Sequence, residues 1–308
     1  MTRRLPDGGL DPLAAHELVG PNADDSPFTP DELCAHAANV DAIVCVLTDK
    51  IDSGVITAGG KLRVVANVAV GYDNIDVSAA RDQGVVVCNT PGVLDETTAD
   101  LAFTLILAAS RLAHDAEDDL RAGRWHGWGI TQYLGQDVHS ATLGIVGYGR
   151  IGRAVARRAA GFGMQVLHHT RTDTGEAGYV ADLDDLLARS DVVSLHVPGG
   201  DTTRHLVDAR RLALMKPTAV LVNTARGPVV DEAALADALH AGRLFAAGLD
   251  VFEREPEVHP QLLSAPRTVL LPHIGSASQA TRTRMARLAA SAVATVLEGG
   301  TPPNVVPS

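Results

Sequence analysis

Three polar residues in the last third of the chain are of the types that can bind a small acidic substrate and move a proton on it. Arg226 precedes Glu255 by 29 residues (226 to 255), and His273 follows Glu255 after a further 18 (255 to 273). A guanidinium can hold a carboxylate or a carbonyl oxygen with two parallel hydrogen bonds. A carboxylate beside an imidazole stabilises the protonated ring, which makes it a proton donor near neutral pH. Together the three residues predict acid/base chemistry, although each alone could be an ordinary surface or strand-end residue.

Each of these residues follows a run of apolar residues that predicts a buried strand. The runs are Ala219–Asn223 before Arg226, Leu244–Leu249 before Glu255 and Thr268–Leu271 before His273. In a parallel sheet the loops that follow the strands lie at one edge, beside the bound ligand. We therefore expect the three side chains at the same edge of one sheet.

The strongest local motif is the hexapeptide GYGRIG. Its residues are Gly147, Tyr148, Gly149, Arg150, Ile151 and Gly152. It follows the predicted strand Thr142–Val146 directly and opens a helix-like stretch, as a dinucleotide-binding turn does. The first glycine permits the tight turn, the second lets backbone amides approach a pyrophosphate, and the third lets the helix pack on the strand. The motif predicts a dinucleotide site, and a glycine-rich turn without a ligand is the alternative.

The end of the next predicted strand indicates which dinucleotide is preferred. Strand Gln165–His168 is followed by Thr170, Arg171 and Thr172, with no carboxylate before Asp173. An NAD-binding protein would carry an acidic residue here for the ribose hydroxyls, whereas a guanidinium flanked by two hydroxyls suits a 2′-phosphate. The segment predicts a preference for NADP(H), with NAD(H) left open and a solvated arginine as the alternative.

The composition excludes several classes of partner. Of the 308 residues 46% are hydrophobic and 20% charged, and 26 Lys and Arg against 37 Asp and Glu leave a net charge of −11. No basic run is present, so nucleic acid and anionic membranes are not expected as partners. No stretch of about 20 apolar residues predicts a membrane span. Three cysteines without a CxxC pair, and a start too polar for a secretory signal, predict a reducing, cytoplasmic location.

No metal site is predicted. The adjacent His168 and His169 are accompanied by no cluster of further ligands at a suitable spacing.

Short apolar runs alternate with helix-like stretches, which predicts an α/β fold. The runs of a first block are Ala42–Leu47, Leu62–Val68 and Val85–Cys88. Six more runs lie between residues 142 and 271, as many as a full dinucleotide-binding sheet has strands. Between the blocks, Leu94–Arg111 predicts a buried apolar helix, and Gln279–Glu298 predicts a helix that returns to the first block.

These elements predict two Rossmann-like or flavodoxin-like domains with parallel sheets. The larger, dinucleotide-binding domain covers residues 93–277 and is inserted into a smaller substrate domain. The smaller domain is discontinuous, with residues 1–92 and 278–308.

Several motifs resemble the signatures of one enzyme family. GYGRIG, NTARGPVVDEAAL, GLDVFEREP and PHIGSAS are similar to those of the D-isomer-specific 2-hydroxyacid dehydrogenases. ANVAVGYDNIDV and NTPGVLDETTADLAF resemble the glyoxylate/hydroxypyruvate reductase branch of that family. The resemblance covers nearly the whole chain. It implies hydride transfer between the nicotinamide of the cofactor and C2 of a 2-oxo acid.

The resemblance also implies a role for each of the three polar residues. His273 matches the family's acid that protonates the nascent alkoxide, and Glu255 matches the carboxylate that orients this acid. Arg226 matches the group that holds the carboxylate and carbonyl oxygen of the substrate. With Arg171 and the motifs of the reductase branch, these roles imply an NADPH-preferring reductase that converts glyoxylate or hydroxypyruvate to glycolate or D-glycerate.

Further site residues follow from the same resemblance. Leu47 and the backbone amides of Val70 and Gly71 match the substrate-binding positions, and Asp250 matches an acidic residue near the nicotinamide carboxamide. Other positions match those that line the cofactor in relatives: Thr98, Val197, Pro198, Thr203, Thr224, Ala225, Gly275 and Ser276. The segment from Trp125 to Trp128 falls where relatives extend an arm across a two-fold axis, which implies a homodimer.

Two alternative functions stay open from the residues alone. The first is an NAD-dependent D-2-hydroxyacid dehydrogenase for a larger or phosphorylated 2-oxo acid, such as a 3-phosphoglycerate dehydrogenase-like enzyme. The second is a non-catalytic protein that senses nucleotides. The chain also departs from the family where it starts Met1-Thr2-Arg3-Arg4-Leu5, since relatives have an apolar strand there. We expect the first sheet to lack that edge strand, through either an upstream start or a loss that the fold tolerates.

Overall fold

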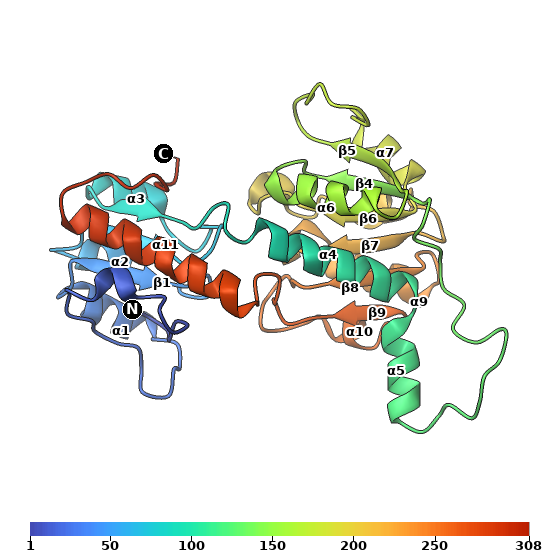
Figure 1. Ribbon diagram of the computed structural model, residues 1–308, viewed down its shortest axis with the longest axis horizontal. Coiled ribbons are helices and arrows are strands. Elements are labelled where there is room, and N and C mark those ends of the chain that lie inside the picture. Colours follow the sequence, from blue (N-terminus) through green and yellow to red (C-terminus); the bar gives the residue numbers. More distant parts are fainter. Residues whose placement is uncertain (308) are drawn as a thin grey trace. The chain divides into compact units, whose positions relative to one another are not determined.

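Parallel strands joined by helices form both units of the computed structural model, which describes residues 1–307 (Figure 1). Unit 1 comprises Met1–Leu94 and the segment from Ser276 onward, and unit 2 comprises Asp95–Gly275. The α/β class with parallel sheets, predicted from the alternation of apolar runs and helix-like stretches, is confirmed.

Unit 1 contains a three-stranded parallel sheet in the order β1-β2-β3. The strands are β1 (Ala42–Cys45), β2 (Val64–Asn67) and β3 (Val86–Cys88). The helices are α1 (Pro30–Ala37), α2 (Ser53–Ala58), α3 (Val77–Asp82) and α11 (Gln279–Leu297), with a short 3₁₀ turn at Asp11–Leu13. Asp52 and Asp76 begin α2 and α3 because their carboxylates accept first-turn N–H groups. Helix α11 contacts all three strands, so the predicted return of the tail helix to the first block is confirmed.

Strand β1 lies at the edge of this sheet. No strand precedes it among the described residues; instead, the Thr2 N–H donates a hydrogen bond to the Val44 carbonyl oxygen over 3.0 Å.

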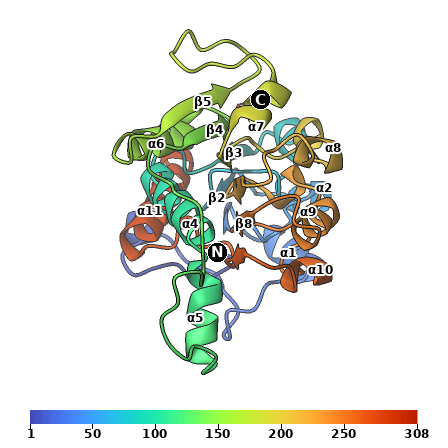
Figure 2. The same cartoon turned by 90° about the vertical axis from the view of Figure 1, so that its right-hand side faces the viewer.

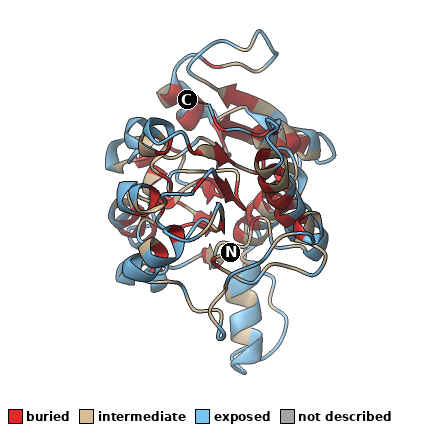
Figure 3. Ribbon diagram, turned by 90° about the vertical axis from the view of Figure 1, so that its left-hand side faces the viewer, coloured by how far each residue is buried: buried red, intermediate tan, exposed pale blue. Residues whose placement is uncertain are grey.

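Unit 2 is built on a six-stranded parallel sheet in the order β5-β4-β6-β7-β8-β9. The strands are β4 (Thr142–Val146), β5 (Gln165–His169), β6 (Val192–Leu195), β7 (Val220–Asn223), β8 (Ala246–Leu249) and β9 (Thr268–Leu270). All six were predicted: the bounds of β4 agree at both ends, and each of the other five strands differs at one end by one or two residues. The central strands β6, β7 and β8 are buried along their length, as near-continuous apolar runs in a parallel sheet require. Figure 3 shows strands mainly in red, as buried, and much of the helices in pale blue, as exposed.

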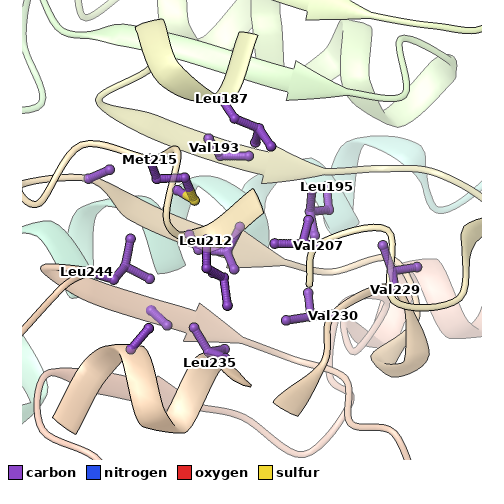
Figure 4. Close-up of a cluster of buried hydrophobic side chains, with 14 of the residues drawn as sticks. Leu187, Val193, Leu195, Val207, Leu212, Met215, Val229, Val230, Leu235 and Leu244 are labelled. Carbon is purple, nitrogen blue, oxygen red and sulfur yellow. The ribbon is translucent and has the colours of Figure 1, made fainter. Parts of the chain in front are cut away.

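Helices cover both faces of this sheet (Figure 2). Helices α4 (Asp95–Ser110) and α6 (Arg150–Ala160) pack on one face and share a buried cluster with β4. On the other face lie α7 (Leu183–Arg189), α8 (Ala209–Leu212), α9 (Glu232–His240) and α10 (Pro260–Leu263). Side chains from α7, α8 and α9 meet the strands there, among them Leu187, Leu212 and Leu235 (Figure 4). Because helices cover both faces, the loops that follow the strands lie at the carboxyl edge of the sheet.

Helix α5 (Ala113–Arg121) and the loop after it project from the body of unit 2 (Figure 1). No residue of α5 is buried, and Trp128 in the loop is 79% exposed. No helix of the described residues is long and apolar enough to cross a membrane.

Candidate active site

The structure places His273 and Glu255 in direct contact. The Nδ1 atom of His273 lies 2.7 Å from Oε2 of Glu255, and the two side chains are 27% and 26% exposed. Both residues stand in loops that follow neighbouring strands, β9 and β8, at the carboxyl edge of the sheet. The strand ends predicted that the two loops meet at this edge, and the family resemblance singled out Glu255 among the carboxylates Asp250, Glu253 and Glu255 that follow β8.

The loop that carries His273 is held by a buried carboxylate. Asp250, which is 1% exposed, accepts hydrogen bonds from the N–H groups of Ile274 and Gly275, each at 2.7 Å. His273 itself has a left-handed backbone with φ of 54°. Such a conformation is costly for a residue with a Cβ, so the bonds on either side help to keep it there. Burial raises the pKa of Asp250 above its ordinary value, although the two N–H donors oppose this shift.

Glu255 is held at both oxygens. While Oε2 contacts His273, Oε1 accepts a hydrogen bond from the Phe252 N–H at 3.0 Å. Burial opposes ionisation of this carboxyl, but the His273 contact, the Phe252 N–H and the charge of Arg226 outweigh it, so the pKa of Glu255 lies below its ordinary value. A carboxylate that stays ionised beside an imidazole favours a protonated ring.

Arg226 belongs to the loop after β7 and acts electrostatically on Glu255. The side chain of Asn223 shapes this loop, because its amide donates to the Arg226 carbonyl oxygen at 2.9 Å and its oxygen accepts from the Ala225 N–H at 3.0 Å. A Cβ on Gly199 would lie 3.0 Å from Cγ of Arg226, so the bare backbone there leaves room for the side chain.

The loops after β7 and β8 touch through their backbones at Gly227. A Cβ on this glycine would lie 1.8 Å from the carbonyl carbon of Phe252 and 2.4 Å from the nitrogen of Glu253. No side chain fits in that space. The close approach brings the loop of Arg226 against the loop of Glu255, so all three predicted residues gather at one edge of unit 2.

The three glycines of the GYGRIG turn have different reasons to lack a side chain. A Cβ on Gly147, whose φ is 93°, would lie 2.6 Å from the carbonyl carbon of His196. A Cβ on Gly152 would lie 2.3 Å from the carbonyl oxygen of Gly147. A Cβ on Gly149 would meet no atom within 4 Å. Protein packing therefore explains the first and third glycines, whereas the open space at Gly149, where α6 begins, fits the approach of a dinucleotide pyrophosphate.

Tyr148 and Arg153 flank this turn and engage the neighbouring strand. The Tyr148 ring stacks on the ring of His168 with centroids 3.9 Å apart, and the Arg153 guanidinium lies 4.6 Å from the Tyr148 centroid. An ion pair joins Arg153 to Glu176. Burial lowers the pKa of His168, and Nε2 of its ring lies 2.8 Å from the hydroxyl oxygen of Thr174.

Arg171 is exposed at the end of β5, between Thr170 and Thr172. The Thr170 hydroxyl donates to the Thr172 carbonyl oxygen at 2.6 Å, which curves the chain around Arg171. No hydrogen bond or ion pair joins the Arg171 guanidinium to another residue in the part of the chain that the structure describes. It is free to bind an anionic group from solution.

Most of the other residues assigned to the cofactor by resemblance lie in loops that follow strands of unit 2. In the loop after β6, the Thr203 hydroxyl donates to the carbonyl oxygen of Pro198 at 2.8 Å, and the backbone of Val197 lies against Gly147. Thr98 at the start of α4 lies near Gly275, since a Cβ on that glycine would be 3.5 Å from Thr98 Cγ2. Thr224 and Ala225 are buried after β7, whereas Ser276 is the residue at which unit 1 resumes.

The predicted substrate residues of unit 1 lie in two loops that asparagine side chains hold. The Asn67 amide donates to the carbonyl oxygen of Gly71 at 2.8 Å and to Oδ1 of Asn74 at 2.9 Å. The Asn74 amide donates to the carbonyl oxygens of Val46 and Asp49, on either side of Leu47. The Asn89 amide donates to the carbonyl oxygen of Val70 at 2.7 Å.

Several of these supporting residues were not identified from the sequence. Asn74 and Asn89 contact substrate loops of unit 1, and Glu232 and His205 contact the loop of Glu255 in unit 2. Three of them lie inside motifs quoted for the family resemblance, Asn74 in ANVAVGYDNIDV, Asn89 in NTPGVLDETTADLAF and Glu232 in NTARGPVVDEAAL, whereas His205 lies in none. Among residues 1–307 no group of three His, Cys, Asp or Glu side chains could hold a metal ion.

Comparisons with known proteins show the family of the chain. The family model for the NAD-binding domain of D-isomer specific 2-hydroxyacid dehydrogenases matches residues 103–275. The chain is 48% identical to a glyoxylate reductase from Korarchaeum cryptofilum and 44% identical to one from Thermococcus onnurineus. Each alignment covers 99% of this chain and 94% of the relative.

A solved structure gives the same result. The NADPH-dependent glyoxylate/hydroxypyruvate reductase from Sinorhizobium meliloti, in complex with NADP and malonate, is 37% identical and superposes with a TM-score of 0.87. The match covers 99% of this chain and 95% of that one. The chain therefore belongs to the D-isomer-specific 2-hydroxyacid dehydrogenase family and is an NAD(P)-dependent oxidoreductase.

Proposed function

We propose that this oxidoreductase reduces glyoxylate and hydroxypyruvate to glycolate and D-glycerate, with NADPH as its preferred hydride donor. The observation that carries the proposal is the 2.7 Å contact between His273 and Glu255, with Arg226 beside it. The names of the relatives support the substrate class, and the NADPH-dependent reductase from Sinorhizobium meliloti supports the cofactor.

His273 acts as the proton donor in this proposal. When bound, the nicotinamide cofactor supplies the hydride that reduces the carbonyl carbon. Since the ionised Glu255 accepts at Nδ1 of the His273 ring, Nε2 is the nitrogen left to give a proton to the substrate oxygen. Glu255 orients the ring and stabilises its positive charge before the proton leaves. The pair thus holds its proton at a defined atom.

Arg226 and unit 1 bind the acid in this proposal. The Arg226 guanidinium grips the substrate carboxylate and stabilises the negative charge that develops on the carbonyl oxygen. The amides of Val70 and Gly71 hold the carboxylate, and Leu47 borders the small substituent at C3. Because asparagine side chains hold both of these loops in place, little ordering is needed when the substrate binds.

The cofactor lies against unit 2 in this proposal. Backbone amides at Gly149 bind the pyrophosphate, and Arg171 with Thr170 and Thr172 binds the 2′-phosphate. Asp250 orients the loop of Ile274 and Gly275 beside the nicotinamide. The remaining contacts come from Thr98, Tyr148, Arg150, Ile151, Val197, Pro198, Thr203, Thr224, Ala225 and Ser276.

The test is oxidation of NADPH and of NADH with glyoxylate, hydroxypyruvate, pyruvate and 3-phosphohydroxypyruvate. We expect NADPH with glyoxylate or hydroxypyruvate to give the highest kcat/KM. The Arg171→Ala variant should lose about tenfold of the preference for NADPH over NADH. Arg189→Ala is the matched control, because Arg189 is also exposed but lies at the C-terminal end of α7. Preferred use of NADH by the wild type would overturn the role of Arg171, and no turnover of any acid would overturn the reductase.

We also propose that the arm formed by α5 and its loop joins two copies of the chain. Its apolar side chains are exposed, with Leu120, Trp128, Ile130 and Leu134 between 58% and 79% accessible. Such a group of exposed apolar residues marks an interaction surface. Sedimentation should show a dimer that Trp128→Ser with Ile130→Ser dissociates, while Leu263→Ser, equally exposed on α10, leaves it intact. A monomeric wild type would refute this assembly.

A further inference from the structure

We propose that Glu232 is a positioning residue, which holds the loop after β8 where Glu255 can reach His273. The proposal rests on the proposed reductase function, because it assigns Glu255 a task in proton transfer. Glu232 is the first residue of α9, and it has no part in the acid/base pair itself.

The two oxygens of Glu232 hold the loop on both sides of Glu255. Oε1 accepts a hydrogen bond from the Glu253 N–H, and Oε2 accepts one from the His259 N–H at 3.2 Å. Glu253 lies two residues before Glu255, and His259 lies four residues after it. The Glu232 carboxylate therefore binds backbone N–H groups on both sides of Glu255 and holds the two ends of this segment together.

The same loop holds Glu232 in return. Oε1 of Glu253 accepts a hydrogen bond from the Glu232 N–H at 3.1 Å, and Oε2 of Glu253 lies 3.1 Å from Nε2 of His205. Burial opposes ionisation of Glu253, but the bonds from His205 and the Glu232 N–H, with the charge of Arg204, bring its pKa below the ordinary value. The loop and the start of α9 are thus joined by reciprocal side-chain to backbone bonds.

Helix formation does not account for a buried glutamate at this place. Asp231 already caps α9, since its carboxylate accepts the Ala234 N–H at 3.0 Å. A glutamate in the first turn of a helix gains from the helix dipole while it remains in water. Glu232 is instead only 5% exposed, and charged side chains are rarely so buried unless they are paired. The N–H groups of the Glu255 loop are the partners that explain its burial.

His205 links this arrangement to the loop of Arg226. Its backbone N–H donates to the Pro228 carbonyl oxygen at 2.7 Å, while its ring contacts Glu253. Gly227 joins the same two loops, because its backbone contacts the backbone of Phe252. Because the loops of Arg226 and Glu255 are joined in two places, release of the Glu232 bonds should move Glu255 without unfolding the sheet.

Three variants test the proposal in the full-length enzyme. In Glu232→Ala both loop bonds are lost, and we expect kcat with glyoxylate to fall about 10- to 100-fold while the Kd of NADPH changes less than about twofold. In Glu232→Gln an amide oxygen still accepts one N–H, so a smaller fall is expected. Asp208→Ala is the control, since Asp208 caps α8 and contacts no residue of the Glu255 loop.

The pH profile separates positioning from a general loss of stability. When Glu255 no longer supports the protonated ring, the basic limb of the kcat/KM profile should move to lower pH in both Glu232 variants. Asp208→Ala should lower the Tm and leave the profile unchanged. If Glu232→Gln folds and retains the kcat and the profile of the wild type, Glu232 does not position Glu255.

A second readout does not need turnover. In the NMR spectrum, assigned with His273→Asn, the ¹⁵N chemical shift of Nδ1 of His273 reports its hydrogen bond to Glu255, and this shift should differ between Glu232→Gln and the wild type. If the wild type reduces no 2-oxo acid, the proposed function fails while this chemical shift still decides the positioning role. An unchanged chemical shift would overturn that role in either case.

Discussion

The loops that follow β7, β8 and β9 are closed against one another, whereas the turn after β4 and the loop after β5 are open. At Gly227 a Cβ would lie 1.8 Å from the backbone of Phe252, and both oxygens of Asp250 and of Glu255 are occupied. At Gly149 a Cβ would meet nothing within 4 Å, and Arg171 extends into solvent. Both regions lie at the same edge of the sheet. In the first region protein atoms occupy the space between the loops, whereas in the second that space is empty.

The difference follows from what each region is proposed to do. A proton moves over a fraction of an ångström, so its donor has to be fixed before the substrate arrives. A dinucleotide is bound by backbone N–H groups and a guanidinium, which have to remain unoccupied until it binds. The loops after β7, β8 and β9, here called the interlocked loops, suit the first task. The turn after β4 and the loop after β5, here called the open region, suit the second.

The largest expected effect comes from removing the proposed proton donor. His273→Asn leaves Glu255 without its ring partner, and kcat with glyoxylate should fall about 10³-fold, within the range for lost general acid catalysis. The Kd of NADPH, measured by fluorescence titration, should change little because the open region is untouched. A kcat within about tenfold of the wild type would show that proton transfer does not depend on this pair.

A smaller loss is expected when the interlocked loops are forced apart. Gly227→Ala puts a methyl group where Phe252 and Glu253 already lie, so the loops of Arg226 and Glu255 have to separate. We expect kcat to fall about 100-fold, as for an ångström-scale misplacement, together with a lower Tm. Gly60→Ala is the control, since a Cβ there meets nothing within 4 Å. Wild-type kcat in Gly227→Ala would mean that the contact has no bearing on the proposed chemistry.

The opposite result is expected in the open region. Gly149→Ala adds a methyl group to empty space, so the Tm should remain that of the wild type. The methyl group would stand where the pyrophosphate approaches, and the Kd of NADPH should rise about tenfold, or about 1.4 kcal/mol. A fall in Tm without a change in Kd would reverse the assignment of the two regions.

The sequence was sufficient for the parts of the molecule that depend on local patterns. Buried parallel strands are continuous apolar runs, so β4 to β9 and the order of polar residues after them could be predicted. The meeting of the loops that carry His273 and Glu255 followed from strand ends at one edge of a parallel sheet, whereas the choice of Glu255 among three carboxylates needed the family resemblance.

The supporting contacts could not be predicted in this way. Glu232 and Glu253 exchange bonds across 21 residues (232 to 253), and Asn74 reaches Val46 across 28. These bonds depend on the exact path of two loops and on which N–H groups have no partner in a strand or helix. The left-handed backbone of His273 is likewise set by the surrounding bonds and not by a glycine-like residue type.

The smallest expected effect concerns stability as a function of pH. The folded-state pKa of Glu255 lies below the ordinary value, so the carboxylate stabilises the fold above about pH 4.3 and loses this contribution as the pH falls toward the folded pKa. Urea unfolding of the wild type and of Glu255→Gln should therefore differ most above about pH 5 and less at about pH 3.5. In a His273→Asn background the difference should shrink, because the ring that lowers the pKa is gone. If the difference in the free energy of unfolding instead grows as the pH falls, burial of Glu255 outweighs its contact with His273. The contact between these two residues would then not be maintained in solution.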